Sequence, residues 1–538
     1  MATTAATATA TASRAAAGGL KRKPQSCRLW RIAFGAAGSA FGLLLIGGPD
    51  PVRAQRLDFG ASVDVYGLAS TNPDLAPKGQ ERPDIRLIFS PGFSLTGTIG
   101  ERFQVSGSGT LGASASLSLR DGASFSTSLR PSGALNGTLE VVDNFFYVDV
   151  RAGLQSGLND PFLATTGPYS PTNTSTTYQV GISPYIKGRL FGDLEYQARS
   201  DNNWTGQAWG DVDYRAQYSA TNTLLVERSP RPIGGAFSLQ QQLLSSSVEG
   251  QDLLETLTAR FSLRYALTSY LTVGARVGAE KYNYTLTANE WQRFYGAEMS
   301  WRPNERTVLE GYWEDRVFGN SWQLAFTYRR PLMALNAVSS RLLSNTPQQF
   351  LTFPGLNSLV SLLNSALTTR IPDPIERQRA VIDVLSRTQL PAELLTPTIL
   401  YSENFTIQEL NNASVVYYGQ RHTLTFTVWQ TITEYSAGIS AALPFSNKTK
   451  ENGTELAFSR QMTPVTTTTA TASWRSTENM LDTSQKTTQT QLRLEASRTL
   501  GRRTDGTLGA RYQWVTSTVT NDATEAAIYF SLTYSFDR

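Results

Sequence analysis

Apolar and hydroxyl-bearing residues alternate along the last dozen residues of the chain. This period of two predicts a β-strand with one face toward hydrocarbon and the other toward water. A soluble β-sandwich shows the same alternation and is the competing interpretation. The apolar positions of this C-terminal strand are Ile528, Phe530, Leu532, Tyr534 and Phe536.

The same alternation recurs upstream, so the C-terminal strand is predicted to be one of many. Two clear examples, 257–265 and 271–279, are separated by a tight turn at 267–269, and others lie at 309–314, 322–329, 492–495 and 508–514. Aromatic residues gather near the ends of these stretches, where a membrane barrel carries aromatic girdles, and this favours the barrel over the sandwich. They are Tyr265, Tyr270, Trp301, Trp313, Trp322, Tyr328 and Trp514.

Short polar connections alternate with longer ones along the chain, as expected for periplasmic turns and external loops. Counting from residue 58 predicts about 22 strands, with 18 to 24 as the range because the boundaries within 205–250 are weak. An even number places both ends of the barrel in the periplasm. The predicted fold class is therefore all-β: a transmembrane antiparallel β-barrel formed by residues 55–538.

The first 54 residues have the features of a signal peptide preceded by a disordered Ala/Thr-rich extension. A positive region from Arg14 to Arg31 precedes the apolar stretch 32–46, and a small-residue cleavage site places the cut between Ala54 and Gln55. A membrane anchor is the alternative, but the apolar stretch is short for a spanning helix and is followed directly by glycines and prolines. We expect export through the Sec pathway to a Gram-negative outer membrane.

Removing the leader changes the charge of the protein. Residues 1–54 hold 7 of the 48 basic and 1 of the 44 acidic residues, which leaves 41 basic and 43 acidic groups and a net charge of −2. The mature chain has no basic patch, so nucleic acid is not an expected partner. Cys27, the only cysteine, leaves with the leader, and His422 is the only histidine, so neither a disulfide nor a Cys/His metal site is expected. No cofactor is predicted.

One segment, 344–400, departs from the strand pattern. Leu359, Leu363 and Leu367 recur at helical spacing, and Asp373-Pro374-Ile375-Glu376 is a helix start signal. The parity of the turns places this two-helix insertion on the external side. A plug within the mouth, a lid over it and an inert packed cap all remain open, because apolar stripes indicate burial without naming the surface.

Five motifs stand out by their order and spacing: residues 75–80, 87–95, 182–185, 318–322 and 370–377. Together, over the span from Leu57 to Phe536, they resemble the outer-membrane proteins associated with the PEP-CTERM/exosortase system, which occur beside exopolysaccharide genes. The resemblance implies an outer-membrane barrel linked to surface polysaccharide or sorted surface proteins, and it implies no catalytic residue. One departure is that Asp537 and Arg538 follow Phe536, whereas signals for the barrel assembly machinery usually end on the aromatic residue.

Alternation directs a set of charged residues of both signs toward the barrel lumen. A mixture of signs suits a hydrated passage for neutral or weakly charged solutes such as glycan, whereas a single-signed ring would favour ions. The alternative is that these charges neutralise one another inside a plugged barrel. The residues are Arg260, Arg264, Arg276, Glu280, Glu298, Glu310, Glu314, Arg329, Arg493, Glu495 and Arg511.

An enzyme is not the expected function. His422 lies beside a short turn rather than in a cluster with a nucleophile, and Glu310 and Glu314 share a face but no recognisable cleft. The sequence predicts a porin-like channel, or a channel component, for exopolysaccharide secretion. A non-conducting scaffold or assembly factor that anchors a surface or periplasmic complex is the alternative. Expected partners are outer-membrane lipid, the barrel assembly machinery, and exopolysaccharide or its export machinery.

Overall fold

The computed structural model describes residues 56–536 except 101, 119–123, 159, 165–172, 209–214, 248–252, 284–289, 350–357, 389, 391–393, 399–401, 403, 436–447 and 483. The chain divides into two compact units, 1–53 and 54–538, and all described residues belong to the second. The predicted signal peptide, its cleavage site at Ala54 and Gln55, and the final Asp537 and Arg538 lie outside the described residues.

The second unit contains 22 strands, as the alternation predicts. They are β1 (Arg56–Ser70), β2 (Asp84–Ile99), β3 (Phe103–Ser118), β4 (Ser124–Val142), β5 (Phe146–Leu158), β6 (Thr174–Leu190), β7 (Leu194–Ala208), β8 (Ala216–Arg228), β9 (Ile233–Ser246), β10 (Leu254–Ala266), β11 (Leu271–Tyr282), β12 (Gln292–Asn304), β13 (Thr307–Arg316), β14 (Gly319–Arg330), β15 (Met333–Ser344), β16 (Thr406–Tyr418), β17 (His422–Tyr435), β18 (Lys448–Thr463), β19 (Thr466–Asn479), β20 (Lys486–Gly501), β21 (Thr504–Ser517) and β22 (Ala523–Ser535).

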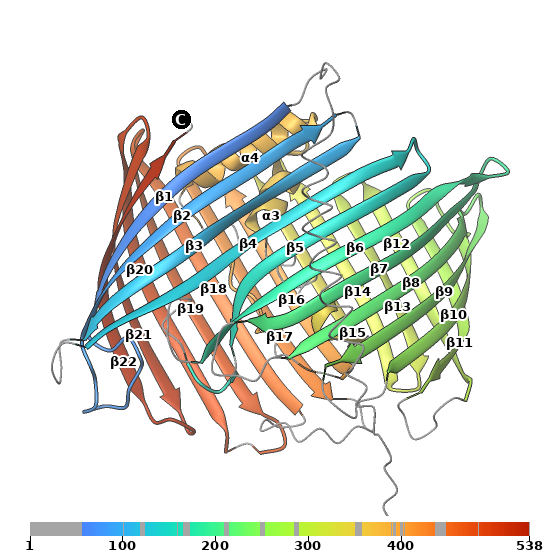
Figure 1. Ribbon diagram of the computed structural model, residues 1–538. Helices are drawn as coiled ribbons and strands as arrows, with labels where there is room; N and C mark the ends of the chain where they lie inside the picture. Colours follow the sequence, from blue (N-terminus) through green and yellow to red (C-terminus); the bar gives the residue numbers. More distant parts are fainter. Residues whose placement is uncertain are drawn as a thin grey trace, which may run out of the picture. The chain divides into compact units, whose positions relative to one another are not determined.

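Every strand pairs antiparallel with the next in the sequence, and the last strand pairs with the first. The closing seam between β22 and β1 runs in continuous register from Ser62 opposite Ser535 to Ser70 opposite Ala527. Gly67 lies opposite Phe530 in this seam, where a Cβ would stand 2.3 Å from the phenyl ring, so the glycine makes room for the ring. The strands therefore form a closed antiparallel β-barrel, and the predicted fold class is confirmed (Figure 1).

The two faces of the barrel wall differ in polarity because side chains alternate along each strand. On β22, the outward residues Ile528 and Phe530 are 63% and 50% exposed, whereas the inward Glu525 and Tyr529 are 1% and 3% exposed. On β17 the inward residues are mostly threonines, with the buried Trp429 among them, and the outward ones Leu424, Phe426 and Val428 are exposed. A wide outer surface of exposed aliphatic and aromatic side chains is characteristic of a lipid-facing wall.

The connections alternate in length as predicted, with one exception. At the end of the barrel where β1 begins and β22 ends, the connections are short, such as 267–270 and 502–503. At the other end they are mostly longer, such as 71–83 and 159–173, but β13 and β14 are joined there by only residues 317–318. We call the two ends the short-turn end and the long-loop end.

The insertion between β15 and β16 contains helices α3 (Leu359–Leu367) and α4 (Pro374–Thr388). The predicted start of α4 is confirmed, because the Asp373 carboxylate accepts a hydrogen bond of 2.9 Å from the backbone N–H of Glu376. Both helices pack on inward residues of the wall, including Ala334, Val416 and Ala457. In Figure 1 they lie inside the ring of strands, toward the end that holds the C-terminus. Among the described residues, no helix is both long and apolar enough to cross a membrane.

Candidate functional site: the barrel lumen

The inner wall carries a dense ion-pair network on β10–β13. Arg260 forms a bidentate pair with Glu314, with Nε–Oε1 and Nη2–Oε2 distances of 2.6 and 3.0 Å. Glu314 has no exposed surface, so this pair has excluded water on the carboxylate side. Two separate strands, β10 and β13, are thus connected across the intervening β11 and β12 by charge-assisted hydrogen bonds.

Arg276 on β11 lies at the centre of this network. Its Nε is 3.2 Å from Glu314 and 3.5 Å from Glu298, and its guanidinium stacks 4.0 Å from the ring centroid of Tyr312. Glu298 also accepts a hydrogen bond of 2.6 Å from Arg264. Arg264 also pairs with Glu227 at 3.1 Å, so three arginines face three glutamates and the network is close to neutral.

A cavity of about 660 Å³ lies beside this network, toward the short-turn end. Its walls combine charged groups with a tyrosine and polar uncharged side chains. Such a lining offers hydrogen-bond donors and acceptors in alternation, without a surplus of either charge. The residues that line it from the inner face include Arg264, Arg276, Glu298, Ser300, Tyr312 and Gln323.

A second inner-wall cluster, on β5–β7, was not predicted from the sequence. Arg199 pairs with Asp149 at 2.9 Å and with Asp201 at 2.8 Å, and Arg151 lies 3.3 Å from Asp201. On β5, Asp149 and Arg151 alternate with Val148 and Val150, and this pattern contains the signal that the two charged residues face inward. In this cluster, too, each guanidinium forms an ion pair with at least one carboxylate.

A third cluster lies near the closing seam. Arg493 donates to the Tyr529 hydroxyl at 2.8 Å and pairs with Glu495 at 2.7 Å. Arg511 pairs with the fully buried Glu525 at 2.7 Å, another partner that sequence reasoning missed. These contacts join β20, β21 and β22 on the lumen side.

All eleven predicted lumen residues lie on the inward-facing positions of their strands, but they do not form one site. Arg260, Arg264, Arg276, Glu298 and Glu314 belong to the β10–β13 network. Glu280 on that wall pairs instead with Arg316, which was not predicted. Glu310 pairs with Arg302 in an exposed contact, and Arg329 donates to the carbonyl oxygen of Glu305 at 2.7 Å, both at the short-turn end. The remaining three, Arg493, Glu495 and Arg511, form the seam cluster.

The insertion occupies the lumen rather than the outer rim. The carbonyl oxygen of Thr388, at the end of α4, accepts hydrogen bonds from Ser459 at 2.6 Å and Thr469 at 3.2 Å, close to the short-turn end of β18 and β19. The chain then returns along β18, where Glu451 accepts from the backbone N–H and the hydroxyl of Thr398 at 3.0 and 2.8 Å. The insertion thus reaches from the long-loop end through the lumen to the opposite end and back.

Two segments cross the long-loop mouth of the barrel. Residues at the base of the insertion contact the far wall: Gln217 on β8 donates to the carbonyl of Ser402 at 2.7 Å, and Gln179 on β6 donates to that of Pro347 at 3.4 Å. The β5–β6 loop crosses in another direction, because Thr487 on β20 donates to the carbonyl of Phe162 at 2.7 Å. The mouth is therefore bridged by backbone held on several strands.

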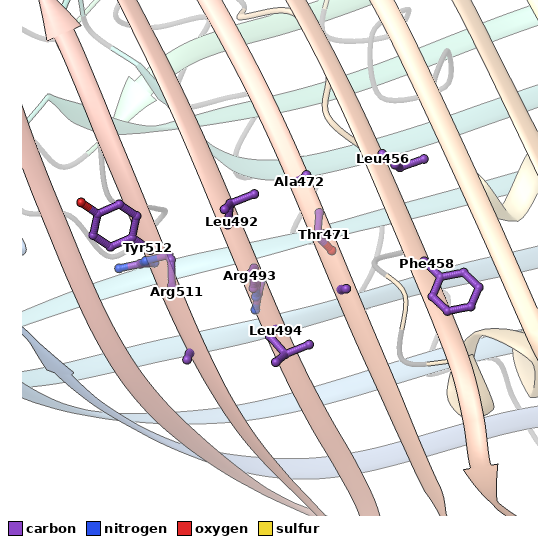
Figure 2. A pocket seen from close by; sticks show the side chains of 11 residues that line it. Leu456, Phe458, Thr471, Ala472, Leu492, Arg493, Leu494, Arg511 and Tyr512 are labelled. Atoms are coloured by element: carbon purple, nitrogen blue, oxygen red, sulfur yellow. The ribbon is translucent and has the colours of Figure 1, made fainter.

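The outer wall of β18–β21 contains a shallow apolar groove of about 450 Å³, formed where small residues lie between larger ones. In Figure 2, Ala472 lies between Leu456 on one neighbouring strand and Leu492 on the other. Arg493 and Arg511 belong to the inner face of the same strands. On the outer face the groove is lined by apolar side chains and by Tyr512, as expected for a lipid-facing surface.

The grouping of potential metal ligands and the position of the only histidine bear on metal and acid–base chemistry. Within the described part of the chain, no group of three or more His, Cys, Asp or Glu side chains is placed to hold a metal ion. His422 is stacked on Phe458 at a centroid distance of 5.9 Å, on the outer face near a short turn. The chemistry of the lumen is that of paired charges and hydroxyls.

No protein-family model and no curated protein matches the sequence. Several solved outer-membrane proteins share a distant structural likeness. The siderophore receptor PirA from Acinetobacter baumannii is 9% identical with a TM-score of 0.42, over 90% of this chain and 81% of the receptor. OccK7 (OpdD) from Pseudomonas aeruginosa is 9% identical with a TM-score of 0.30, over 89% and 99%. OprD from Pseudomonas aeruginosa is 8% identical with a TM-score of 0.28, over 89% and 95%. The fold is therefore argued from the strand pairing above, and the function from the lumen.

Proposed function

We propose that this protein is a porin-like barrel of the Gram-negative outer membrane that passes neutral or weakly charged polar solutes, as a channel or channel component in exopolysaccharide secretion. The closed sheet and the apolar outer wall support membrane residence, because an open sheet edge cannot be tolerated in hydrocarbon. The observation that carries the solute class is the pairing of opposite charges on the inner wall, centred on Arg260 and Glu314.

Paired charges favour neutral solutes for a physical reason. A ring of one sign attracts counter-ions and repels co-ions, which produces ion selectivity. In the β10–β13 network each guanidinium already faces carboxylates, so a permeating ion would gain little and would have to displace an existing partner. A polyhydroxylated molecule needs only hydrogen bonds of both kinds, which the wall offers beside the cavity of about 660 Å³.

A non-conducting scaffold is the second candidate, and the bridged mouth favours it. The contacts of Gln217 with Ser402 and of Thr487 with Phe162 hold backbone across the long-loop end. If these bridges and the helices leave no continuous path, the barrel would serve as an anchor for partners at either end. The two candidate functions differ in whether a solute passes through the barrel.

Liposome swelling distinguishes the candidates. Residues 55–538 are refolded into vesicles, and the heat-modifiable gel mobility of the product shows that the barrel has formed. Vesicles are then diluted into iso-osmotic solutions of a neutral disaccharide or of a singly charged sugar acid of similar size. Faster swelling in the neutral sugar supports the proposal. Equal impermeability to both sugars, from a barrel shown to be folded, supports the scaffold instead.

A further inference from the structure

The outer wall of β7–β10 is interrupted by hydrogen-bonded polar side chains. Ser200 donates to the Asn222 carbonyl oxygen at 2.7 Å, Asn222 donates to Gln241 at 3.1 Å, and Gln241 donates to Glu255 at 2.6 Å. Asn202 extends the chain, donating to the Ser200 hydroxyl at 3.0 Å. We call these five residues the outer polar ladder.

The register shows that the ladder faces outward. Ser200 lies opposite Asn222, and Asn222 lies opposite Gln241. Leu224, two residues beyond Asn222, lies opposite Leu239, two residues before Gln241. Both leucines are therefore on the same face as the ladder, and both are exposed. Antiparallel partners point to the same side of a sheet, so the ladder shares the apolar outer wall.

Apolar residues border the ladder on several sides. Ile182 on β6 lies opposite Asn202 and is 41% exposed, and Leu257 on β10 lies opposite Gln241. Toward the long-loop end, Trp204 and Tyr218 pack with ring centroids 5.3 Å apart. Most of the ladder therefore lies within the apolar wall. Glu255, the second residue of β10, connects it to the rim at the long-loop end.

Contact with hydrocarbon is unfavourable for the polar side chains of the ladder. An amide nitrogen carries two hydrogens, and the bonds within the ladder use one from Asn222 and one from Gln241. Lipid tails offer no hydrogen-bond partner for the remaining capacity. The outer wall of β20–β22 has no such interruption between Leu492 and Phe530, both well exposed and apolar. A second outward polar row, which includes Asn411, Gln430 and Asn452, lies on β16–β18, so the ladder is one of at least two polar interruptions of the apolar wall.

A hollow of about 500 Å³ adjoins the ladder. Ala198 and Ser200 are small residues on its β7 side, Ile186 stands on one flank, and Leu224 and Leu239 form a ridge on the other. A hollow beside a ridge can receive the same ridge from a second molecule related by a two-fold axis, since such an axis presents identical surfaces to each other.

We propose that the outer face of β7–β10 is the interface at which a second copy of this chain docks within the membrane, an inference that rests on the proposed outer-membrane residence. Amides both donate and accept hydrogen bonds, so the three amide residues of the ladder, Asn202, Asn222 and Gln241, are complementary to the same residues of a second copy. Pairing two ladders removes amides from hydrocarbon in both copies, while the ridge of each copy fills the hollow of the other.

Site-directed crosslinking tests this interface cleanly, because Cys27 is the only cysteine and lies in the predicted leader. Ala198→Cys places a thiol in the hollow, and Ala472→Cys places a matched thiol in the outer groove of Figure 2, on β19, ten strands away around the ring of 22. Residues 55–538 carrying either change are reconstituted in vesicles of outer-membrane lipid and treated with a short bismaleimide. We expect a crosslinked dimer from Ala198→Cys in at least tenfold excess over Ala472→Cys.

A second variant tests the chemistry of the contact. Asn222→Leu with Gln241→Leu, in the Ala198→Cys background, removes the ladder amides and should lower the dimer yield at least tenfold. Gln430→Leu is the matched control, because Gln430 is an outward amide on β17 bonded to Asn452 at 2.9 Å, and its loss should leave the yield unchanged. Heat-modifiable mobility shows that each variant is folded.

The outcomes separate this inference from the proposed function. Failure of the folded protein to enter vesicles contradicts membrane residence itself. Insertion with equal, low crosslinking at both positions overturns the dimer interface and leaves the channel proposal intact. Native mass spectrometry that finds a monomer with a retained lipid, lost in the Asn222→Leu/Gln241→Leu variant, also overturns the second copy and assigns the ladder to lipid.

Discussion

The guanidinium of Arg475 on β19 donates a hydrogen bond of 3.0 Å to the carbonyl oxygen of Thr396 in the returning arm of the insertion. The neighbouring Glu451 accepts from the backbone N–H of Thr398 at 3.0 Å. The barrel wall therefore holds the insertion by charged side chains that bind its backbone, a contact roughly twice as strong as one between neutral groups.

Arg475→Ala is predicted to loosen this arm without unfolding the barrel. Loss of the guanidinium leaves the Thr396 carbonyl without this donor, so amide hydrogen exchange at 394–398 should accelerate at least tenfold. Arg460→Ala on the outer face of β18 is the control, because Arg460 is exposed and faces away from the lumen. Unchanged exchange in Arg475→Ala would mean that the arm is held by other contacts.

Removal of Glu314 is predicted to be among the most destabilising changes of the inner wall. Glu314→Ala leaves Arg260 and Arg276 without their shared carboxylate in a buried setting, which costs about 3–5 kcal/mol. The readout is the midpoint of urea unfolding followed by tryptophan fluorescence and by the heat-modifiable gel shift.

Glu310→Ala on the same strand provides the matched control for this experiment. Its ion pair with Arg302 is solvent-exposed, with side-chain exposures of 45% and 63%, so its loss should cost no more than about 1 kcal/mol. Equal destabilisation by the two changes would show that burial of the network contributes nothing to the stability of the barrel.

Thr487→Val is predicted to release the β5–β6 loop from its crossing of the mouth. The change keeps the shape of the side chain but removes the hydroxyl that donates to the Phe162 carbonyl at 2.7 Å. Proteolysis added from the long-loop side of reconstituted vesicles should then cleave within 159–173 several times faster, and cleavage elsewhere should not change. Identical cleavage rates would contradict the bridge.

The loop should also respond to pH through Asp160. Burial raises the pKa of this half-buried carboxyl, opposed by the hydrogen bond of 2.8 Å that it accepts from the backbone N–H of Phe162. A raised pKa means that the folded loop binds the proton more tightly than the open loop, so loop stability should increase as pH falls from neutral through the folded pKa toward the ordinary pKa of an aspartate.

Asp160→Asn tests the sign of this effect, because asparagine keeps an acceptor for Phe162 without a titrating charge. The variant should show slower amide exchange at 160–164 at neutral pH and no gain on acidification, after correction for intrinsic exchange. A native loop that instead loses protection as pH falls would contradict the assignment.

The barrel could be predicted from sequence because successive side chains of each strand face lipid and lumen in turn, which gives apolar and polar residues a period of two. In β22 each apolar residue from Ile528 to Phe536 alternates with a hydroxyl, and the register of the seam preserves that parity around the ring. The inward direction of the charged side chains could be predicted for the same reason. The helical spacing of Leu359, Leu363 and Leu367 likewise predicted α3.

The ion-pair partner of a residue on another strand could not be predicted from the same alternation. Periodicity shows that Glu280 faces inward, but its partner Arg316 lies two strands away, and that choice depends on the stagger of the sheet. The insertion leaves β15 at the long-loop end, which turn parity predicted to be the external side, but the choice between plug, lid and cap could not be predicted, because an apolar stripe does not specify the surface that covers it. In the structure α4 enters the lumen and ends beside Ser459 near the short-turn end. The polar interruption at Asn222 was also missed, since it appears only when four strands are aligned.

Single-channel conductance of the barrel with and without its insertion decides whether the protein is a channel. Ser344 lies opposite Thr406, so a short Gly/Ser link can replace 345–405 and leave the pairing of β15 and β16 intact. We predict a small, steady conductance from the complete barrel, several-fold larger after replacement, and blocked in both by a neutral oligosaccharide. Absence of current from both proteins, each shown to be folded and inserted, would contradict the channel and leave the scaffold.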